Sequence, residues 1–265
     1  MFWPMDDFLW PFLAGLPLAL ALPLLGTLLR LRDEWLATLG LAHLAAAAAL
    51  AGMGLGLAAV WGAPVGAMLG ALGKTLARQR NNSVYAVMIL GGWSLMLLIA
   101  ANSALGHALA QALVDGQLYF AGDREAFLAA TVALLCLWAL PWLTPRLIRA
   151  RLLPSFERAN HLPAWRWHLG FDLLVALTVA VATATLGLMA TFALVFVPAW
   201  LAFRHAPSWR RAWRFSTGVG IAAYGLAFAL ALGLDQPFGP VLVLLLVSAL
   251  ILDGFVRRGP RDAGV

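Results

Sequence analysis

Long apolar stretches separated by short polar segments dominate this sequence. They lie at residues 8–29, 35–60, 64–73, 84–105, 127–143, 169–184, 186–203, 216–234 and 238–254. Each except the third is near the length of roughly 20 residues that a helix needs to cross the hydrocarbon core of a bilayer. The pattern therefore predicts an all-α, polytopic integral membrane protein with about nine transmembrane helices, and eight or ten remain alternatives.

Two apolar stretches are too long for one helix each. The stretch 35–73 contains Trp61-Gly62-Ala63-Pro64, which predicts a break between two helices there. The stretch 169–203 is expected to divide near 183–185. Neither strand-like alternation nor an internal repeat is visible in the sequence, so we expect residues 1–265 to form a single transmembrane domain.

The composition supports a membrane protein. Of 265 residues, 63% are hydrophobic and 11% are charged, and the mean hydropathy is +0.87. A soluble domain has too much surface for its volume to bury so large an apolar fraction. The single cysteine, Cys136, excludes an internal disulfide and a cysteine-based zinc cluster.

The basic residues predict the orientation in the membrane. With nine spans, 17 of the 18 Lys and Arg residues fall on one side, and only Arg124 falls on the other. The positive-inside rule makes the basic side cytoplasmic, which predicts an N-out, C-in, multi-pass protein of the inner membrane. The high pI thus reflects topology in the lipid bilayer, and no nucleic-acid partner is expected.

The largest predicted cytoplasmic segment, residues 146–168, is too polar to span the membrane. Pro154 suits the first position of a helix, where its missing N–H would have no partner. Phe156, Ala159 and Leu162 then fall on or near one face, and Pro163 ends the run. This pattern is typical either of a short amphipathic helix on the membrane surface or of a docking helix for a cytoplasmic partner.

Two predicted external segments also stand out. Residues 113–127 are acidic and contain Gly116, and residues 232–246 contain Asp235 before two prolines. Residues 113–127 are either an ordinary interfacial loop or a contact surface for an extracytoplasmic partner. Asp235 either has a direct role in substrate entry or caps the last helix, where a carboxylate favours the N-terminal end.

Four motifs resemble those of permease subunits of zinc/manganese-type ABC importers, the family-3 metal ABC permeases. The segment from Leu39 to Gly52, with His43, is similar to the second-span motif of that family. Residues 154–163 resemble its cytoplasmic coupling segment, residues 186–199 its Gly-containing helix ending in Pro-Ala, and residues 235–240 its closing Asp-x-Pro-x-Gly-Pro. The four occur in the family's order and cover most of the chain.

The resemblance implies a role for each matching position. It implies a metal-binding role for His43, and packing or gating roles for Gly187 and Pro198. It implies that six residues couple the permease to an ATPase: Pro154, Phe156, Glu157, Ala159, Leu162 and Pro163. It also implies that six residues of the external loops make contacts: Gly116, Gln117, Asp235, Pro237, Gly239 and Pro240.

The resemblance also implies the partners. These are a separate ABC ATPase that binds ATP and Mg²⁺, an extracytoplasmic metal-binding protein, and a second permease copy, with a homodimer expected. The chain itself is expected to bind no cofactor and to carry Zn²⁺ or Mn²⁺ as transported substrate. It has no Gly-x-x-x-x-Gly-Lys-Ser/Thr loop with which to hydrolyse ATP, so no enzymatic activity is expected.

Three positions depart from the family pattern. Leu39 stands where the family has Asp, Leu90 where zinc-type members often have His, and Gln117 where an acidic residue is found. Residues i and i+4 share a helix face, so Leu39 removes a carboxylate that would assist His43. A bare divalent ion in a low-dielectric path needs such compensating charge.

The sequence thus predicts a permease subunit of an ABC importer, with a divalent metal ion, by default zinc, as substrate. One alternative is a permease for a metal–chelate complex or another small solute. A non-transporting membrane scaffold is a second alternative. An intramembrane enzyme is disfavoured, because no HExxH motif, paired intramembrane carboxylates or Ser/His pair is evident at usable spacing.

Overall fold

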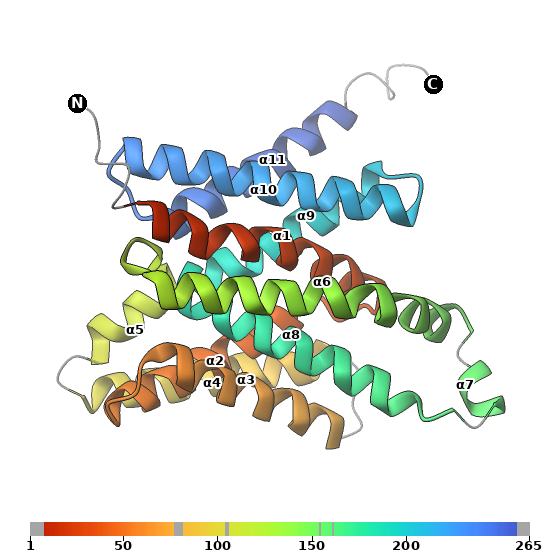
Figure 1. Cartoon of the computed structure of the whole chain (residues 1–265), viewed down its shortest axis with the longest axis horizontal. Helices are drawn as coiled ribbons and strands as arrows, with labels where there is room; N and C mark the ends of the chain where they lie inside the picture. The colour runs from red at the N-terminus through yellow and green to blue at the C-terminus, as the bar shows by residue number, and fades with distance from the viewer. Residues whose placement is uncertain (1–7, 77–81, 104–105, 154, 161, 259–265) are drawn as a thin grey trace.

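The structure is a computed structural model that describes residues 8–76, 82–103, 106–153, 155–160 and 162–258. Its elements are helices that run for the most part along the long axis of the molecule (Figure 1). They are α1 (Leu9–Leu31), α2 (Ala37–Gly54), α3 (Ala59–Leu76), α4 (Asn82–Ala101), α5 (Gly106–Asp115), the 3-10 turn η1 (Leu118–Phe120), α6 (Asp123–Leu152), α7 (Phe156–Ala159), α8 (Ala164–Leu186), α9 (Leu188–His205), α10 (Trp209–Gly233) and α11 (Phe238–Arg258). The all-α prediction is confirmed.

Eight helices in the described part of the chain are long and apolar enough to cross a membrane: α1, α2, α4, α6, α8, α9, α10 and α11. The expected third span corresponds to α3, which has 18 residues and ends near the charged Lys74. The prediction of about nine spans therefore agrees approximately with the structure. Many side chains on the outer faces of α4 and α11 are exposed and apolar, as a lipid-facing surface requires.

The break between α2 and α3 is not where the sequence predicted it. Residues 61–64 lie inside α3, and the chain turns at 55–58 instead. Gly56 adopts a φ of +81°, a conformation that glycine permits without steric cost. Similarly, α8 continues to Leu186, beyond the expected division near 183–185, and α9 begins directly after Gly187.

The helices form two groups that α8 and α9 connect. In one group α1 packs against α6, α9 and α10, and in the other α2 packs against α3 and α4. Figure 1 shows α10 and α11 at one edge of the molecule and α2, α3 and α4 at the opposite edge. The chain runs back and forth, so successive connections alternate between two ends.

We name these two ends by the short helices that they carry. The α5 end contains α5, η1 and the α8–α9 turn, and the α7 end contains α7 and the α1–α2 connection (Figure 1). The connections that carry most of the basic residues lie at the α7 end. In the predicted orientation this is the cytoplasmic end.

Candidate functional site

His43 lies on α2 and is almost completely buried, with 4% of its surface exposed. Its Nδ1 donates a hydrogen bond of 2.8 Å to the carbonyl oxygen of Leu39, one turn earlier on the same helix. The imidazole ring also meets the edge of the Trp93 ring on α4, with the ring centroids 5.8 Å apart. The side chain is therefore held between α2 and α4 with one nitrogen fixed by the backbone.

Small residues allow α4 and α3 to approach α2 closely. A Cβ atom added at Gly92 of α4 would come within 2.7 Å of the backbone carbonyl carbon of His43. On the other side, Gly62, Gly66 and Gly70 recur every fourth residue of α3 and meet the backbone or side chains of α2. Such spacing of small residues is a common means of close helix packing in membranes. The backbone around His43 is thus tightly enclosed.

The three positions that departed from the family pattern do not converge on His43. Leu39 contributes its backbone carbonyl, as described, while its own side chain is half-buried. Leu90 is 69% exposed on the outer surface of α4. Gln117 lies at the α5 end, where its N–H donates to the carbonyl of Thr185. Among the described residues, no group of three His, Cys, Asp or Glu side chains is placed to hold a metal ion.

The predicted coupling segment forms a short helix and two flanking turns at the α7 end. Of its residues, Pro154 lies outside the described part of the chain. Phe156 packs under the guanidinium of Arg149 on α6, 5.0 Å from its ring centroid. Glu157 lies 3.9 Å from the Nε2 of His168 on α8. The helix α7 is therefore attached on both sides to the long helices that flank it.

The remaining residues of the coupling segment point away from the bundle. Ala159, Leu162 and Pro163 are all exposed. Pro163 stands immediately before α8, which is where the predicted helical run ends. Small and apolar side chains are therefore exposed at the α7 end.

Three of the predicted external and packing residues meet at one junction. Gly116, Gly187 and Gly239 bring together the end of α5, the α8–α9 turn and the start of α11. Gly116 has a φ of +91° and Gly187 a φ of +93°. A Cβ atom at Gly187 would lie 2.6 Å from the backbone nitrogen of Gly116. We call these three residues the glycine junction, and only glycine satisfies its geometry.

The other external residues surround this junction. An open cleft of about 510 Å³ is lined by residues of α5 and η1 together with Gln117 and Pro237. Asp235 and Pro240 are exposed, and Asp235 has a φ of +52°. Among the hydrogen bonds of the described residues, none joins the Asp235 carboxylate to α11, so its interpretation as a helix cap gains no support. Sequence segments more than 100 residues apart thus form one surface.

Pro198, the second predicted packing residue, lies away from the junction. It is buried in the middle of α9. Because proline lacks an N–H, the carbonyl four residues earlier loses its usual helical partner. The backbone hydrogen bonds of α9 are therefore interrupted at this position, although the helix continues on both sides.

The sequence did not predict a buried cluster of charges at the α7 end. Arg32 contacts Glu34 at 3.1 Å and Asp172 at 3.0 Å, and Lys74 contacts the same two carboxylates at 2.8 and 2.9 Å. Each of the four side chains is at most 8% exposed. We call Arg32, Glu34, Lys74 and Asp172 the charge ring, because each cation bridges both anions. The ring has no net charge.

The charge ring joins four helices, and Tyr85 adds a fifth. Arg32 follows α1, Glu34 precedes α2, Lys74 lies in the last turn of α3 and Asp172 lies on α8. The hydroxyl of Tyr85, on α4, donates to Glu34 at 3.2 Å. Burial alone would raise the pKa of the Glu34 carboxyl, but the charges of Arg32 and Lys74 outweigh burial and hold that pKa below its ordinary value.

One signal in the sequence points to this ring. Asp172 lies inside the predicted sixth span, where an ionisable side chain usually has a partner and a function. The partners were not recoverable, because Arg32 and Lys74 precede Asp172 by 140 and 98 residues. In the sequence, Arg32 and Lys74 resemble ordinary charged residues of the loops between spans.

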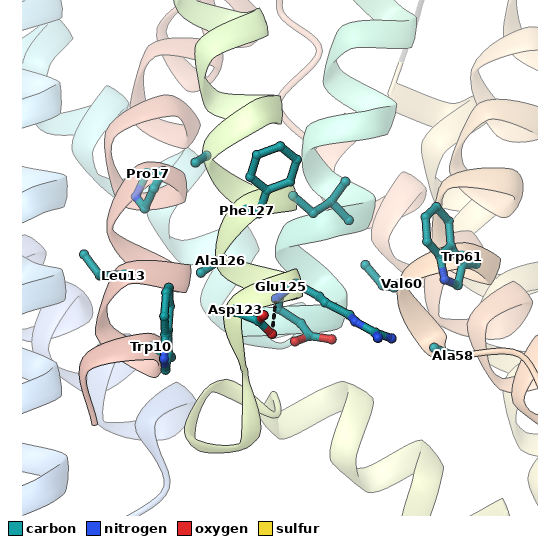
Figure 2. Close-up of a pocket in the computed structure, with 13 residues that line it drawn as sticks. Trp10, Leu13, Pro17, Ala58, Val60, Trp61, Asp123, Glu125, Ala126 and Phe127 are labelled. Atoms are coloured by element: carbon teal, nitrogen blue, oxygen red, sulfur yellow. Dashed lines mark hydrogen bonds between the residues drawn. The ribbon is translucent and has the colours of Figure 1, made fainter. Parts of the chain in front are cut away.

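A separate groove of about 870 Å³ opens on the side of the bundle at the α5 end. Figure 2 shows Trp10, Leu13 and Pro17 of α1 on one side of it and Trp61 of α3 on the other, with the start of α6 between them. The lining is mostly apolar, and the tryptophans suit a membrane interface. None of the lining residues belongs to α2 or α4, so this groove is distinct from the surroundings of His43.

Comparison with known proteins identifies the class. The ABC 3 transport family matches residues 5–257, nearly the whole chain. The chain therefore belongs to this family, as its motifs indicated, and is a membrane-spanning permease subunit of an ABC transporter. It is a multi-pass protein of the inner membrane.

Individual relatives agree with this assignment. An uncharacterized membrane protein of Synechocystis is 24% identical over 253 residues, which cover 92% of this chain and 89% of that protein. Among solved structures, PsaBC from Streptococcus pneumoniae in complex with Fab has a TM-score of 0.80 at 17% identity, covering 93% of this chain and 90% of the other. A transporter described as of the metal-chelate ABC type, in an inward-facing conformation, has a TM-score of 0.73 at 16% identity, with 94% and 87% covered. These two structures show that the fold is shared.

Proposed function

We propose that this permease belongs to an importer that carries a divalent metal ion into the cytoplasm, with zinc as the default substrate and manganese as the alternative. Family membership supports a metal substrate, and His43 is the residue that we assign to bind it. ATP hydrolysis by a separate subunit supplies the energy.

The hydrogen bond of His43 is the observation that carries this proposal. A carbonyl oxygen can only accept, so Nδ1 carries the proton, and in the neutral ring Nε2 has the free lone pair. Histidines that bind metal ions typically donate their other ring N–H to a backbone carbonyl or carboxylate in this way. The contact with Leu39 therefore prepares the imidazole as a ligand through Nε2.

A single imidazole is a weak metal site, and weak binding suits transport because the path must release what it binds. Among the described residues of one chain, no group of three or more His, Cys, Asp or Glu side chains is placed to hold a metal ion. We propose that two copies of the chain each contribute one His43 to a common path. Further ligands then come from water or from backbone carbonyl groups.

The partners are assigned to the two ends of the bundle. The exposed face formed by Ala159, Leu162 and Pro163 suits docking of an ABC ATPase, since these side chains project from the α7 end. The cleft beside Gln117 and Pro237 suits an extracytoplasmic metal-binding protein at the α5 end. PsaBC and the metal-chelate type transporter, both of this fold, support the general arrangement of an ABC transporter.

The proposed orientation is N-out and C-in, but the charge ring reduces the number of basic residues that support it. Arg32 and Lys74 are neutralised by Glu34 and Asp172, so they add nothing to the cytoplasmic excess of positive charge. The other basic residues at the α7 end retain the bias. In a Cys136→Ala background, a cysteine replacing the 88%-exposed Phe120 should be labelled from outside and one replacing Arg211 should not. The reverse accessibility would overturn the orientation.

Metal uptake by His43→Ala tests the function. In cells lacking the native gene, we expect this variant to insert normally but to lose most zinc or manganese accumulation, because the only assigned imidazole ligand is gone. His107→Ala is the matched control, since His107 is exposed on α5 and should leave uptake unchanged. Leu39→Asp should tighten metal binding by placing a carboxylate one turn from His43. Undiminished uptake by His43→Ala would contradict a metal-binding role.

A second candidate function is transport of a metal–chelate complex. Leu39, Leu90 and Gln117 replace polar side chains of the family pattern, which favours a less highly charged cargo. In that case His43→Ala should accumulate the chelate normally. The same variant therefore distinguishes the two cargoes.

A further inference from the structure

The charge ring is connected to the coupling segment through α8. Glu157 of α7 lies 3.9 Å from His168, which lies in the second turn of α8. Asp172 follows His168 by one helical turn, so the two side chains share a face of α8. Asp172 also lies eight residues after Ala164, about 12 Å along the helix axis at ~1.5 Å per residue.

The other members of the ring stand directly before α2. Arg32 and Glu34 lie in the connection between α1 and α2, and Glu34 precedes the first residue of α2 by three. The helix then continues without interruption through His43. Asp172 is the member of the ring that belongs to α8. It pairs directly with Arg32 of the α1–α2 connection, and through Lys74 it is linked to Glu34, three residues before α2.

We propose that Asp172 is a positioning residue for transport: through the charge ring, it transmits movement of the coupling segment to α2 and thereby to His43. This inference rests on the proposed function for the cargo, but the mechanical connection does not depend on which cargo is carried. When an ATPase displaces α7, α8 moves with it, and the ring pulls the start of α2.

The physical basis is the cost of separating buried charges. Removing one carboxylate from two buried cations leaves charge without compensation in a low-dielectric environment. Movement of α8 away from α2 is therefore unfavourable, and the two helices move together as long as the ring is closed.

Two charge-balanced double variants separate transmission from stability. Lys74→Met with Asp172→Asn leaves the Arg32–Glu34 pair and removes the ionic connection to α8. Lys74→Met with Glu34→Gln leaves the Arg32–Asp172 pair and keeps that connection. Each variant removes one cation and one anion, so the two are matched in charge and in the number of altered side chains.

The measurement is the ATP-driven change in distance between spin labels on α2 and α11. Labels replace the exposed Leu55 and Leu252 in a Cys136→Ala background, in the complete transporter with one labelled copy of the chain. We expect the wild-type ring and the Glu34→Gln double variant to show the change. In the Asp172→Asn double variant, the fraction of transporters that shows the distance change should fall about 5-fold or more. An effect of about 5-fold is the lower end of the typical range of coupling between two sites.

The outcomes are decisive in either direction. Loss of the distance change in the Asp172→Asn variant alone supports transmission, whereas loss in both variants, in neither, or only in the control overturns it. Both double variants should melt within a few degrees of each other. If the amide variant folds poorly, Asp172→Leu with Lys74→Met replaces it, since apolar residues of similar volume often replace buried ion pairs without loss of stability.

The failure of this inference is distinguishable from failure of the proposed function. The distance change requires no assumption about metal ions. Conversely, His43→Ala should lose metal uptake and keep the distance change, because it leaves the charge ring intact. A transporter that carries another cargo would therefore still test the role of Asp172.

Discussion

The two ends of the bundle are closed by different kinds of contact. At the α5 end, the glycine junction lets three backbone segments touch. Next to it, aromatic rings of α1, η1, α10 and the start of α11 pack together with centroids 5.3–6.3 Å apart, and these rings are Phe8, Phe12, Tyr119, Tyr224, Phe228 and Phe238. This end is held by backbone fit and apolar packing.

At the α7 end, charged side chains make the connections. All ion pairs of the described residues lie here, including the charge ring and the pair between Arg204 and Asp253. The guanidinium of Arg146 lies 4.0 and 4.4 Å from the ring centroids of Trp142 and Trp167, which meet each other edge to face. This end is held by electrostatic contacts between helices.

The difference indicates which end can change its contacts during a transport cycle. A close-packed backbone junction has one arrangement, and any displacement opens a gap without a partner. A partly exposed charged side chain, such as Arg204, can exchange its partner for water at little cost, while the buried charge ring keeps α8 and the start of α2 moving together. We therefore expect the α7 end to rearrange and the α5 end to act as a fixed support. The following predictions test this comparison.

Lys74→Met should have the largest effect on stability. It leaves Arg32 facing two buried carboxylates, and removing one partner of a buried ion pair typically costs about 3–5 kcal/mol. Thermal melting in detergent should show a large drop. Arg204→Met is the control, because the Arg204 side chain is 35% exposed and such pairs contribute about 1 kcal/mol or less. Equal melting of the two variants would remove the distinction between buried and exposed pairs.

Gly187→Ala should have the next largest effect. Its φ of +93° and ψ of 161° are nearly exclusive to glycine, and forcing another residue into that region costs about 1–3 kcal/mol. The added methyl group would also meet the backbone of Gly116. Gly170→Ala is the control, since a Cβ atom there meets nothing within 4 Å and alanine favours the helix. A Gly187→Ala protein that melts like Gly170→Ala would show that the junction tolerates displacement.

Much of the fold follows from the sequence because apolar length is a local property. A run of about 20 apolar residues has few alternatives to a membrane-spanning helix, so α1, α4, α9 and α11 were expected near their observed bounds. The break between α2 and α3 was mislocated because Pro64, the sixth residue of α3, lies inside a helix, and membrane helices tolerate internal prolines. The turn instead occurs at Gly56, whose positive φ has no distinct sequence signal.

The site was less accessible to sequence reasoning. His43 was identified because it is a lone ionisable residue in an apolar run, which is a local signal. The glycine junction and the charge ring join residues far apart in sequence, and packing alone determines those pairs. The individual residues Gly116, Gly187 and Asp235 were named, but that Gly116 and Gly187 touch each other required the structure.

Lowering the pH should have a smaller effect on the stability of the fold. The pKa of the Glu34 carboxyl is lowered in the folded protein, so its ionised form stabilises the fold above the ordinary carboxyl pKa. That contribution disappears as the pH falls through the lowered value. The melting temperature should therefore decrease as the pH falls below about 4.5, the ordinary pKa of this carboxyl. The double variant Glu34→Gln with Lys74→Met should show a shallower decrease, and an equal decrease would assign the acid sensitivity to other groups.

The smallest effect should come from the aromatic cluster at the α5 end. The hydroxyl of Tyr224 donates to the carbonyl oxygen of Phe12 at 2.9 Å, and Tyr224→Phe removes this bond while keeping the ring. The loss should be about 0.5–1.5 kcal/mol, the net contribution of one hydrogen bond. Tyr119→Phe is the matched control, because its buried hydroxyl has no hydrogen-bond partner among the described residues. It should melt at or slightly above the wild-type temperature, since removing an unpaired buried hydroxyl relieves a desolvation cost. If Tyr224→Phe were as damaging as Lys74→Met, the α5 end would depend on polar contacts as much as the α7 end does.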